Sequence, residues 1–383
     1  MKPPRARRRW RGWTSKALTL AVSSLLALLL GEGLVRWLAP QQLIVLRPDI
    51  WIPADDGTGW RMAPGVDTRV NLGERTVHLG TDRRGHRIRS QEARADPAWR
   101  VLALGDSFLA ALQVEAEDTL TARLEDGLAE RLAAPVEVVN TGVGGWDPNH
   151  YLIEGRRELE REHYDAVLVF LFLGNDAVAE RVDRFNPKIA DVRHRLRWPR
   201  SLTRNEVIKA WLYPVNDALE TRSQLFILAR QAAWQSLQRF GLSARRLPTT
   251  DLVAERDSPR WRITGDLCAE LAAAAAARRV PALFVLLPGA YHVDAELARS
   301  YTRNLGLDPS EVDLEQTRRL LTAALAERSL PTFDTTEPLR RLHNSGARTH
   351  GEVDTHFTAA AHRAVAEMLL DRVTEMLAED RSS

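Results

Sequence analysis

A serine, a histidine and a carboxylate occur in this chain at positions that could form a nucleophilic site. Gly-Asp-Ser-Phe at residues 105–108 directly follows an apolar run, and Asp-Thr-His lies much later, at residues 354–356. A serine hydroxyl attacks a carbonyl carbon at neutral pH only when an imidazole accepts its proton and a carboxylate holds the imidazole tautomer. We therefore expect acyl chemistry, with Ser107 as nucleophile, His356 as general acid and base, and Asp354 as its orienter.

The elements that would position these residues alternate along the chain. Apolar strand-like runs are separated by segments with helical spacing of apolar residues, such as the Leu120 to Leu132 stripe and the segment from about residue 358. The runs lie at residues 101–104, 136–140, 166–173, 282–287 and 331–334. This alternation predicts an α/β fold with a parallel central sheet covered by helices on both faces.

Three short polar or glycine-rich segments follow three of the predicted strands. Ser107 follows the first, residues 140–145 follow the second, and residues 174–176 follow the third. Ligand sites in parallel α/β sheets lie at the carboxyl ends of the strands. We expect the three segments to meet at one edge of the sheet.

These segments resemble the sequence blocks of the SGNH, or GDSL-like, hydrolase superfamily, and in particular its membrane-anchored bacterial members. Gly-Asp-Ser-Phe matches the nucleophile block, Asn-Thr-Gly-Val-Gly-Gly at residues 140–145 the glycine block, Gly-Asn-Asp at 174–176 the asparagine block, and Asp-Thr-His-Phe at 354–357 the final block. The resemblance extends over about residues 60–377. The chain has no Gly-x-Ser-x-Gly motif, which argues against an α/β-hydrolase.

The resemblance implies a three-layer α/β/α, flavodoxin-like SGNH fold and a complete set of site residues. Ser107 would attack an ester carbonyl, and the backbone N–H groups of Ser107 and Gly145 with the side-chain amide of Asn175 would hold the oxyanion. The mechanism needs neither a cofactor nor a metal. His350, Asp354, His356 and His362 are close in sequence, but their spacing is not that of a known metal motif, and we expect no metal there.

The N-terminus has the pattern of a membrane anchor. Residues 1–16 carry seven basic side chains and no acidic one, and residues 17–38 are mostly apolar, which is long enough for a transmembrane helix. The basic flank predicts a cytoplasmic N-terminus by the positive-inside rule. No convincing cleavage site precedes Pro40, so we expect a single-pass inner-membrane protein whose catalytic domain is periplasmic.

The remaining chain divides into two sections. Residues 41–97 are rich in Pro, Gly, Asp and Arg and predict an irregular or hairpin-like section. Residues 98–380 would form the hydrolase domain, interrupted at 180–262 by a polar, tryptophan-containing helical insertion that could cap the site.

Composition excludes other classes of protein. With 44% hydrophobic and 27% charged residues, the chain is globular. Removing the seven basic residues of the N-terminus leaves 46 basic against 51 acidic side chains, which argues against nucleic-acid binding. The lone cysteine, Cys268, is expected to be a small buried hydrophobe.

We therefore expect a membrane-anchored serine esterase that acts on acyl, most simply acetyl, esters of a cell-envelope or exported polysaccharide. The same residues would serve a polysaccharide O-acetyltransferase, in which a sugar hydroxyl replaces water. A catalytically idle, glycan-binding scaffold is the third alternative. The expected partners are an acylated carbohydrate or small ester and the membrane, whereas the sequence predicts no particular protein partner.

Overall fold

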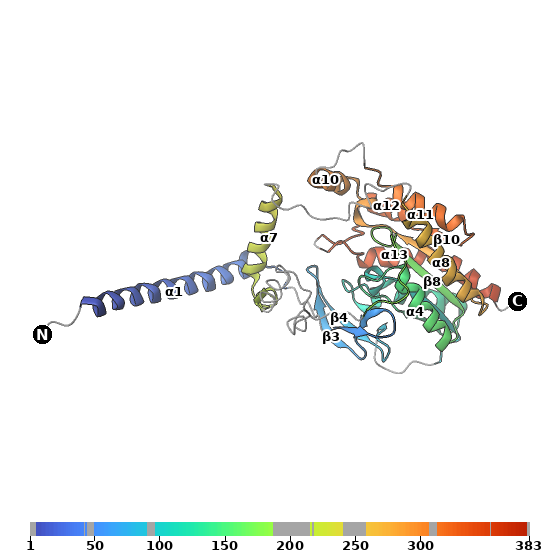
Figure 1. The fold of residues 1–383 in the computed structure, drawn as a ribbon, viewed down its shortest axis with the longest axis horizontal. Helices are drawn as coiled ribbons and strands as arrows, with labels where there is room; N and C mark the ends of the chain where they lie inside the picture. Colours follow the sequence, from blue (N-terminus) through green and yellow to red (C-terminus); the bar gives the residue numbers. More distant parts are fainter. Residues whose placement is uncertain are drawn as a thin grey trace.

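Five parallel strands form the centre of the structure, a computed structural model of the chain (Figure 1). They are β6 (Trp99–Leu104), β7 (Val136–Asn140), β8 (Ala166–Phe172), β9 (Ala282–Leu287) and β10 (Thr332–Asp334). Their spatial order is β10-β9-β8-β6-β7. This is the flavodoxin-like order, in which the chain changes direction beside the first strand of the set, β6. The predicted α/β class with a parallel central sheet is confirmed.

The structure describes most of the chain, with gaps. The described residues are 5–41, 43, 50–89, 96–186, 215–216, 218–239, 258–305, 312–352 and 354–380.

Helices cover both faces of the sheet because side chains alternate along each strand. Val101 and Ala103 of β6 point into one apolar layer, and Leu102 and Leu104 point into the other. The first layer is closed by α3 (Leu120–Leu132) and α13 (Ala359–Asp380). The second is closed by α4 (Pro148–Arg161), α8 (Arg260–Ala276) and α11 (Gln316–Ala326). The result is a three-layer α/β/α core, and Cys268 is buried in it.

The section at residues 41–97 contributes to the same sheet. β1 (Trp51–Ala54) and β2 (Gly59–Met62) form a separate antiparallel pair. β3 (Asp67–Asn71), β4 (Thr76–Thr81) and β5 (Arg87–Ile88) extend the main sheet to eight strands. β5 pairs antiparallel with β7 through Arg87 and Asn140. The sequence predicts only an irregular or hairpin-like section here; it does not predict that three of these strands join the central sheet, because short alternating strands give no sign of their partner.

The N-terminal helix α1 (Arg5–Leu38) projects away from the α/β core (Figure 1). Its Ser15–Leu38 part has a mean hydropathy of 2.0 and is long and apolar enough to cross a membrane. Its C-terminal end contacts α7 (Gln224–Arg239). Glu32 accepts hydrogen bonds from Ser223 Oγ (2.8 Å) and from the backbone N–H groups of Gln224 and Leu225 (both 3.0 Å). Thus one carboxylate of α1 caps the first turn of α7.

α7 belongs to the predicted insertion at residues 180–262, whose residues 187–214, 217 and 240–257 lie outside the described part. The described helix lies beside the end of α1 (Figure 1). Shorter helices complete the described fold: α2 (Ser107–Ala110), α9 (Ala290–Val293), α10 (Ala295–Leu305) and α12 (Thr336–Asn344).

Candidate active site

Ser107 is the first residue of α2, which begins three residues after β6 ends. The carboxylate of Asp106 accepts a hydrogen bond of 2.8 Å from the backbone N–H of Phe108, and so caps this short helix. The turn presents the Ser107 hydroxyl at the carboxyl edge of the sheet. This is the edge at which the sequence places the nucleophile.

His356 lies between Ser107 and Asp354. Its Nε2 is 2.7 Å from Ser107 Oγ, and its Nδ1 is hydrogen-bonded to Asp354 Oδ1. The ring centroid of His356 lies 4.7 Å from that of Phe108, which packs against the imidazole. In this arrangement Nδ1–H donates to the carboxylate, so that Nε2 can accept the serine proton. The structure therefore brings the three residues singled out in the sequence into one hydrogen-bonded row.

The electrostatics of this row favour a charged imidazole beside a charged carboxylate. Burial alone would lower the pKa of His356, but the hydrogen bond to Asp354 and the charges of Asp354 and Asp106 raise it above the usual value. Burial would likewise raise the pKa of Asp354, yet its hydrogen bonds with His356 and Gln113 and the charge of His356 hold it below the usual value. An imidazolium formed during proton transfer is stabilised here.

Two side chains that the sequence reasoning missed hold Asp354. Gln113 Nε2 donates to Asp354 Oδ2 over 2.9 Å, and Glu74 Oε1 accepts from the backbone N–H of Asp354 over 3.0 Å. Gln113 lies on the segment after α2, and Glu74 lies between β3 and β4. Neither belongs to a motif, so no local signal in the sequence identifies them.

Arg87 fixes the segment that joins Ser107 to Gln113. Its buried guanidinium donates to the carbonyl groups of Ala110 (2.6 Å), Ala111 and Val114 (2.7 Å). Burial lowers the pKa of Arg87 to about 10, so the side chain remains charged at neutral pH. A charged donor with three carbonyl acceptors stabilises a loop that would otherwise leave these groups unpaired.

The glycine block at residues 140–145 lies next to the nucleophile. A Cβ atom at Gly142 would come within 2.4 Å of the Ala110 nitrogen, and one at Gly144 would lie 3.9 Å from Ser107 Cβ. Gly145 has φ of +78°, a conformation that glycine adopts without strain. The glycines at positions 142, 144 and 145 thus allow the backbone of residues 140–145 to lie close to the segment that begins at Ser107.

Asn175 follows β8, the strand beside β6 on the side opposite to β7. Its side chain is exposed at the same edge of the sheet, whereas Asp176 is buried. The Asp176 carboxylate accepts from Tyr151 OH (2.9 Å) and from the Phe172 N–H (2.8 Å). Asp176 thus holds the turn that presents Asn175.

His350 and His362, the other histidines near the final block, make structural contacts. His350 Nε2 donates to the Pro288 carbonyl over 3.2 Å, and His362 Nδ1 accepts from the Leu120 N–H over 3.2 Å. Burial lowers the pKa of His350 to about 4 and that of His362 to about 3, so both rings are neutral at physiological pH.

A cavity of about 540 Å³ opens beside His356 and Asp354. Its wall includes Glu74, Arg75, Gln113, Val114, Arg348, Phe357 and Thr358. This volume lies in the range of pockets that bind small molecules. A substrate in it would lie on the Asp354 side of the imidazole.

The solved structures most similar to this chain include several ester hydrolases. A lipase/acylhydrolase from Enterococcus faecalis is 12% identical with a TM-score of 0.39, over 72% of this chain and 96% of that one. TesA is 14% identical with a TM-score of 0.38, over 72% and 99%. The acetyl xylan esterase AlAXEase is 11% identical with a TM-score of 0.39, over 72% and 99%.

No protein-family model and no curated protein sequence matches the chain. Similarity to solved structures at these levels of identity and TM-score does not assign a function. The functional assignment therefore depends on the chemistry that Ser107, His356 and Asp354 can perform.

Proposed function

We propose that this chain is a membrane-anchored serine esterase of the SGNH class that hydrolyses acyl, most simply acetyl, esters of a cell-envelope or exported polysaccharide. The observation that carries the proposal is the 2.7 Å separation of Ser107 Oγ and His356 Nε2, with Asp354 on the other ring nitrogen. A partly buried serine, histidine and aspartate in a hydrogen-bonded row have a specific use in acyl transfer.

The first half of the reaction forms an acyl-enzyme. Ser107 Oγ attacks the ester carbonyl carbon as its proton passes to His356 Nε2, and Asp354 stabilises the resulting imidazolium. The N–H groups of Ser107 and Gly145 and the amide of Asn175 hold the negative oxygen of the tetrahedral intermediate. The intermediate then collapses: the bond to the alcohol oxygen breaks, and His356 gives its proton to that oxygen.

The second half releases the acid. A water molecule attacks the acyl carbon while His356 accepts its proton, and the bond to Ser107 Oγ breaks as His356 returns a proton to it. A sugar hydroxyl in place of water would transfer the acyl group to the glycan. The cavity beside His356 and Asp354 has the volume to hold a neighbouring sugar residue of the substrate.

The N-terminal helix supports a membrane location. Its apolar length suits a single span, and the basic residues before it favour the cytoplasmic side for the N-terminus. The α/β core would then face the periplasm, where polysaccharide esters are accessible.

The test uses the full chain purified in detergent. Acid release from p-nitrophenyl acetate is measured with and without an acetylatable oligosaccharide, for the wild type and for Ser107→Ala and His356→Ala. Ser345→Ala, at an exposed serine after α12, is the matched control. We expect hydrolysis by the wild type and the control and none above background in the two site variants.

Other outcomes lead to different conclusions. Serine-dependent transfer to the oligosaccharide with little hydrolysis would make the protein an O-acetyltransferase. Equal inertness of all four proteins towards short and long acyl esters, with glycan binding retained, would leave only the scaffold.

A further inference from the structure

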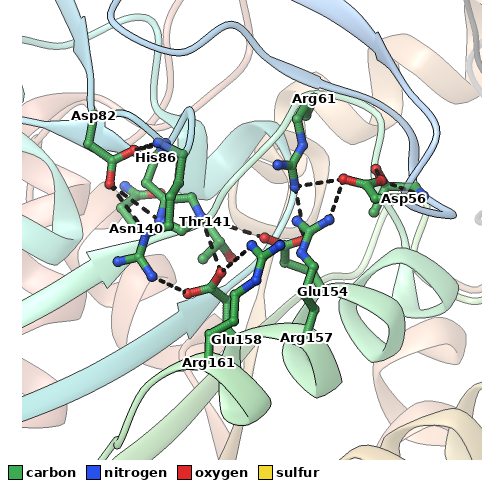
Figure 2. Close-up of polar contacts among 12 residues, drawn as sticks. Asp56, Arg61, Asp82, His86, Asn140, Thr141, Glu154, Arg157, Glu158 and Arg161 are labelled. Carbon is green, nitrogen blue, oxygen red and sulfur yellow. Dashed lines mark hydrogen bonds and ion pairs between the residues drawn. The ribbon is translucent and has the colours of Figure 1, made fainter.

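A second cluster of titratable groups lies between the β4–β5 turn and α4. His86 precedes β5, and Glu154 and Glu158 lie one turn apart on α4. Their side chains converge (Figure 2), and the residues are 5%, 1% and 0% exposed. Each of the three residues offers one possible metal-ligand atom, and these atoms lie within 4.8 Å of one another.

The distances in this cluster are too long for hydrogen bonds. His86 Nε2 lies 3.5 Å from Glu154 Oε1 and 4.0 Å from Glu158 Oε1. None of these three atoms has a hydrogen-bond partner among the described residues. Ligand atoms that share a tetrahedral ion with bonds of about 2.0–2.2 Å are separated by roughly 3.3–3.6 Å. The 3.5 Å between His86 Nε2 and Glu154 Oε1 fits this range, and Glu158 Oε1, at 4.0 Å, would have to move closer by a few tenths of an ångström.

The second oxygen of each glutamate is already occupied. Glu154 Oε2 accepts from Arg61 Nη2 (3.2 Å) and from Arg157. Glu158 Oε2 accepts from Arg84 Nη1 (2.9 Å) and from Tyr164 OH (2.8 Å). These contacts orient both carboxylates so that their Oε1 atoms face His86.

The other ring nitrogen of His86 also faces a carboxylate. Asp82 Oδ2 lies 3.6 Å from Nδ1, on the side of the ring away from the glutamates. Histidines that ligate metals commonly direct the second nitrogen at a carboxylate, which fixes the tautomer and leaves the Nε2 lone pair free.

We propose that His86, Glu154 and Glu158 bind a divalent cation of the zinc type, which ties the β4–β5 turn to α4. One imidazole nitrogen and two carboxylate oxygens are ligands that Zn²⁺ accepts. Two carboxylates also balance the charge of the ion within its immediate ligand set. A cavity of about 40 Å³ borders His86, and its wall also includes Asp82 and Arg84.

The surrounding arginines set the strength of binding. Arg61, Arg84 and Arg157 contact the glutamates, and Arg161 Nη1 lies 3.7 Å from Glu158 Oε1. Their positive charges also repel a cation. We therefore expect weaker binding than at a closed four-ligand zinc site, with release of the ion to chelators.

The site has a structural consequence for the catalytic segment. His86 is followed directly by Arg87, whose guanidinium holds the loop after Ser107. An ion that fixes His86 to α4 would hold Arg87 in place from the other side. We expect it to stabilise the folded chain without taking part in the acyl chemistry.

The test measures zinc bound to the full chain in detergent. Protein stripped with a chelator is equilibrated with Zn²⁺, and the bound metal and the thermal unfolding are then measured. The proteins compared are the wild type, His86→Ala, Glu154→Gln and Glu158→Gln. The two glutamine substitutions preserve the shape of the side chain. His163→Ala removes an exposed histidine near the end of α4 and is the control. We expect one equivalent of zinc and a raised Tm for the wild type and the control, and loss of both effects in the three variants.

X-ray absorption of the bound zinc supplies a readout that does not depend on variant stability. A first shell of one nitrogen and at least two oxygens is expected, and the nitrogen scatterer should be lost in His86→Ala. No bound zinc in the folded wild type, or the same stoichiometry and Tm shift in all five proteins, would overturn the proposal and leave a cluster of buried ion pairs. Ester hydrolysis is measured separately, so its loss or retention does not decide the metal site.

Discussion

Gln113 Nε2 donates a hydrogen bond of 2.9 Å to Asp354 Oδ2, the carboxylate oxygen that does not contact His356. The two residues are 241 positions apart in sequence. Gln113 lies six residues after Ser107, so the segment that carries the nucleophile also holds the orienter of its base. The segment at residues 107–113 thus contacts the row at both ends: Ser107 contacts His356, and Gln113 contacts Asp354.

Replacing Gln113 should therefore lower kcat. A hydrogen bond to a charged group contributes about 1.5–3 kcal/mol, so Gln113→Ala should reduce kcat for a small ester by roughly tenfold to a hundredfold, with a smaller change in KM. Steady-state kinetics beside Glu130→Ala, an exposed position on α3, measures this. An unchanged kcat would show that Asp354 keeps its orientation without Gln113.

Asn175→Ala should lower kcat by about 10²–10³-fold if its amide donates to the oxyanion, because such a donor acts mainly in the transition state. KM should change little. Glu180→Ala, at a nearby exposed position, is the control. If kcat falls less than tenfold, the backbone donors of Ser107 and Gly145 suffice and the side chain has another role.

The pH dependence of the reaction should follow His356. Its pKa is raised above the usual value of 6.5, so the free base needed to accept the serine proton forms only above that pH. We expect kcat/KM for a small ester to rise with pH through one ionisation above 6.5. In Asp354→Asn the residual activity should show this ionisation at lower pH; the same midpoint in both proteins would assign it to another group.

Stability should fall on mild acidification because three histidines are buried in the neutral form. Burial lowers the pKa of His292 and His362 to about 3 and that of His350 to about 4. Below pH 6.5 the unfolded chain binds protons that the folded chain does not, so each residue lowers the free energy of unfolding by about 1.4 kcal/mol per pH unit.

Thermal unfolding between pH 7.5 and 5 measures this effect. His356 contributes with the opposite sign, since its raised pKa stabilises the fold at low pH and this contribution is lost as the pH rises through the folded value. His362→Gln should flatten the pH dependence at some cost in stability. A Tm that does not fall towards pH 5 would contradict neutral burial of the three rings.

Glu32→Ala should release α7 from α1, because the carboxylate accepts three hydrogen bonds from the start of α7. We expect faster limited proteolysis within residues 215–239 and less than a twofold change in hydrolysis of a small ester. Ser24→Ala, on the exposed part of α1, is the control. Equal cleavage rates in all three proteins would mean that other contacts suffice to hold α7.

The parallel core could be predicted from the sequence because its strands are buried on both faces and read as apolar runs. The observed β7 and β9 have the predicted bounds, 136–140 and 282–287. The positions of Ser107 and Asn175 at the carboxyl edge followed from the same pattern.

Contacts between distant segments could not be predicted in this way. Glu74, Gln113 and Arg87 are ordinary polar residues in sequence, and only the pairing of β5 with β7 brings Arg87 beneath the nucleophile segment. Likewise, Glu154 and Glu158 are four residues apart, and charged residues at this spacing usually lie on the solvent-exposed face of a helix. Their burial depends on contacts of α4 with the section at residues 41–97, which the sequence predicts only as an irregular or hairpin-like section without a partner.

The hydrogen bond between Glu74 and Asp354 also determines when the site can form during synthesis. The two residues are 280 positions apart, so at 5–20 residues per second Asp354 is made on the order of 14–56 s after Glu74. Ser107 is made 33 residues after Glu74, so for most of this interval the growing chain contains the serine but not Asp354 or His356. In the proposed mechanism, an incomplete chain that ends before His356 therefore lacks the base for Ser107 and would be inactive.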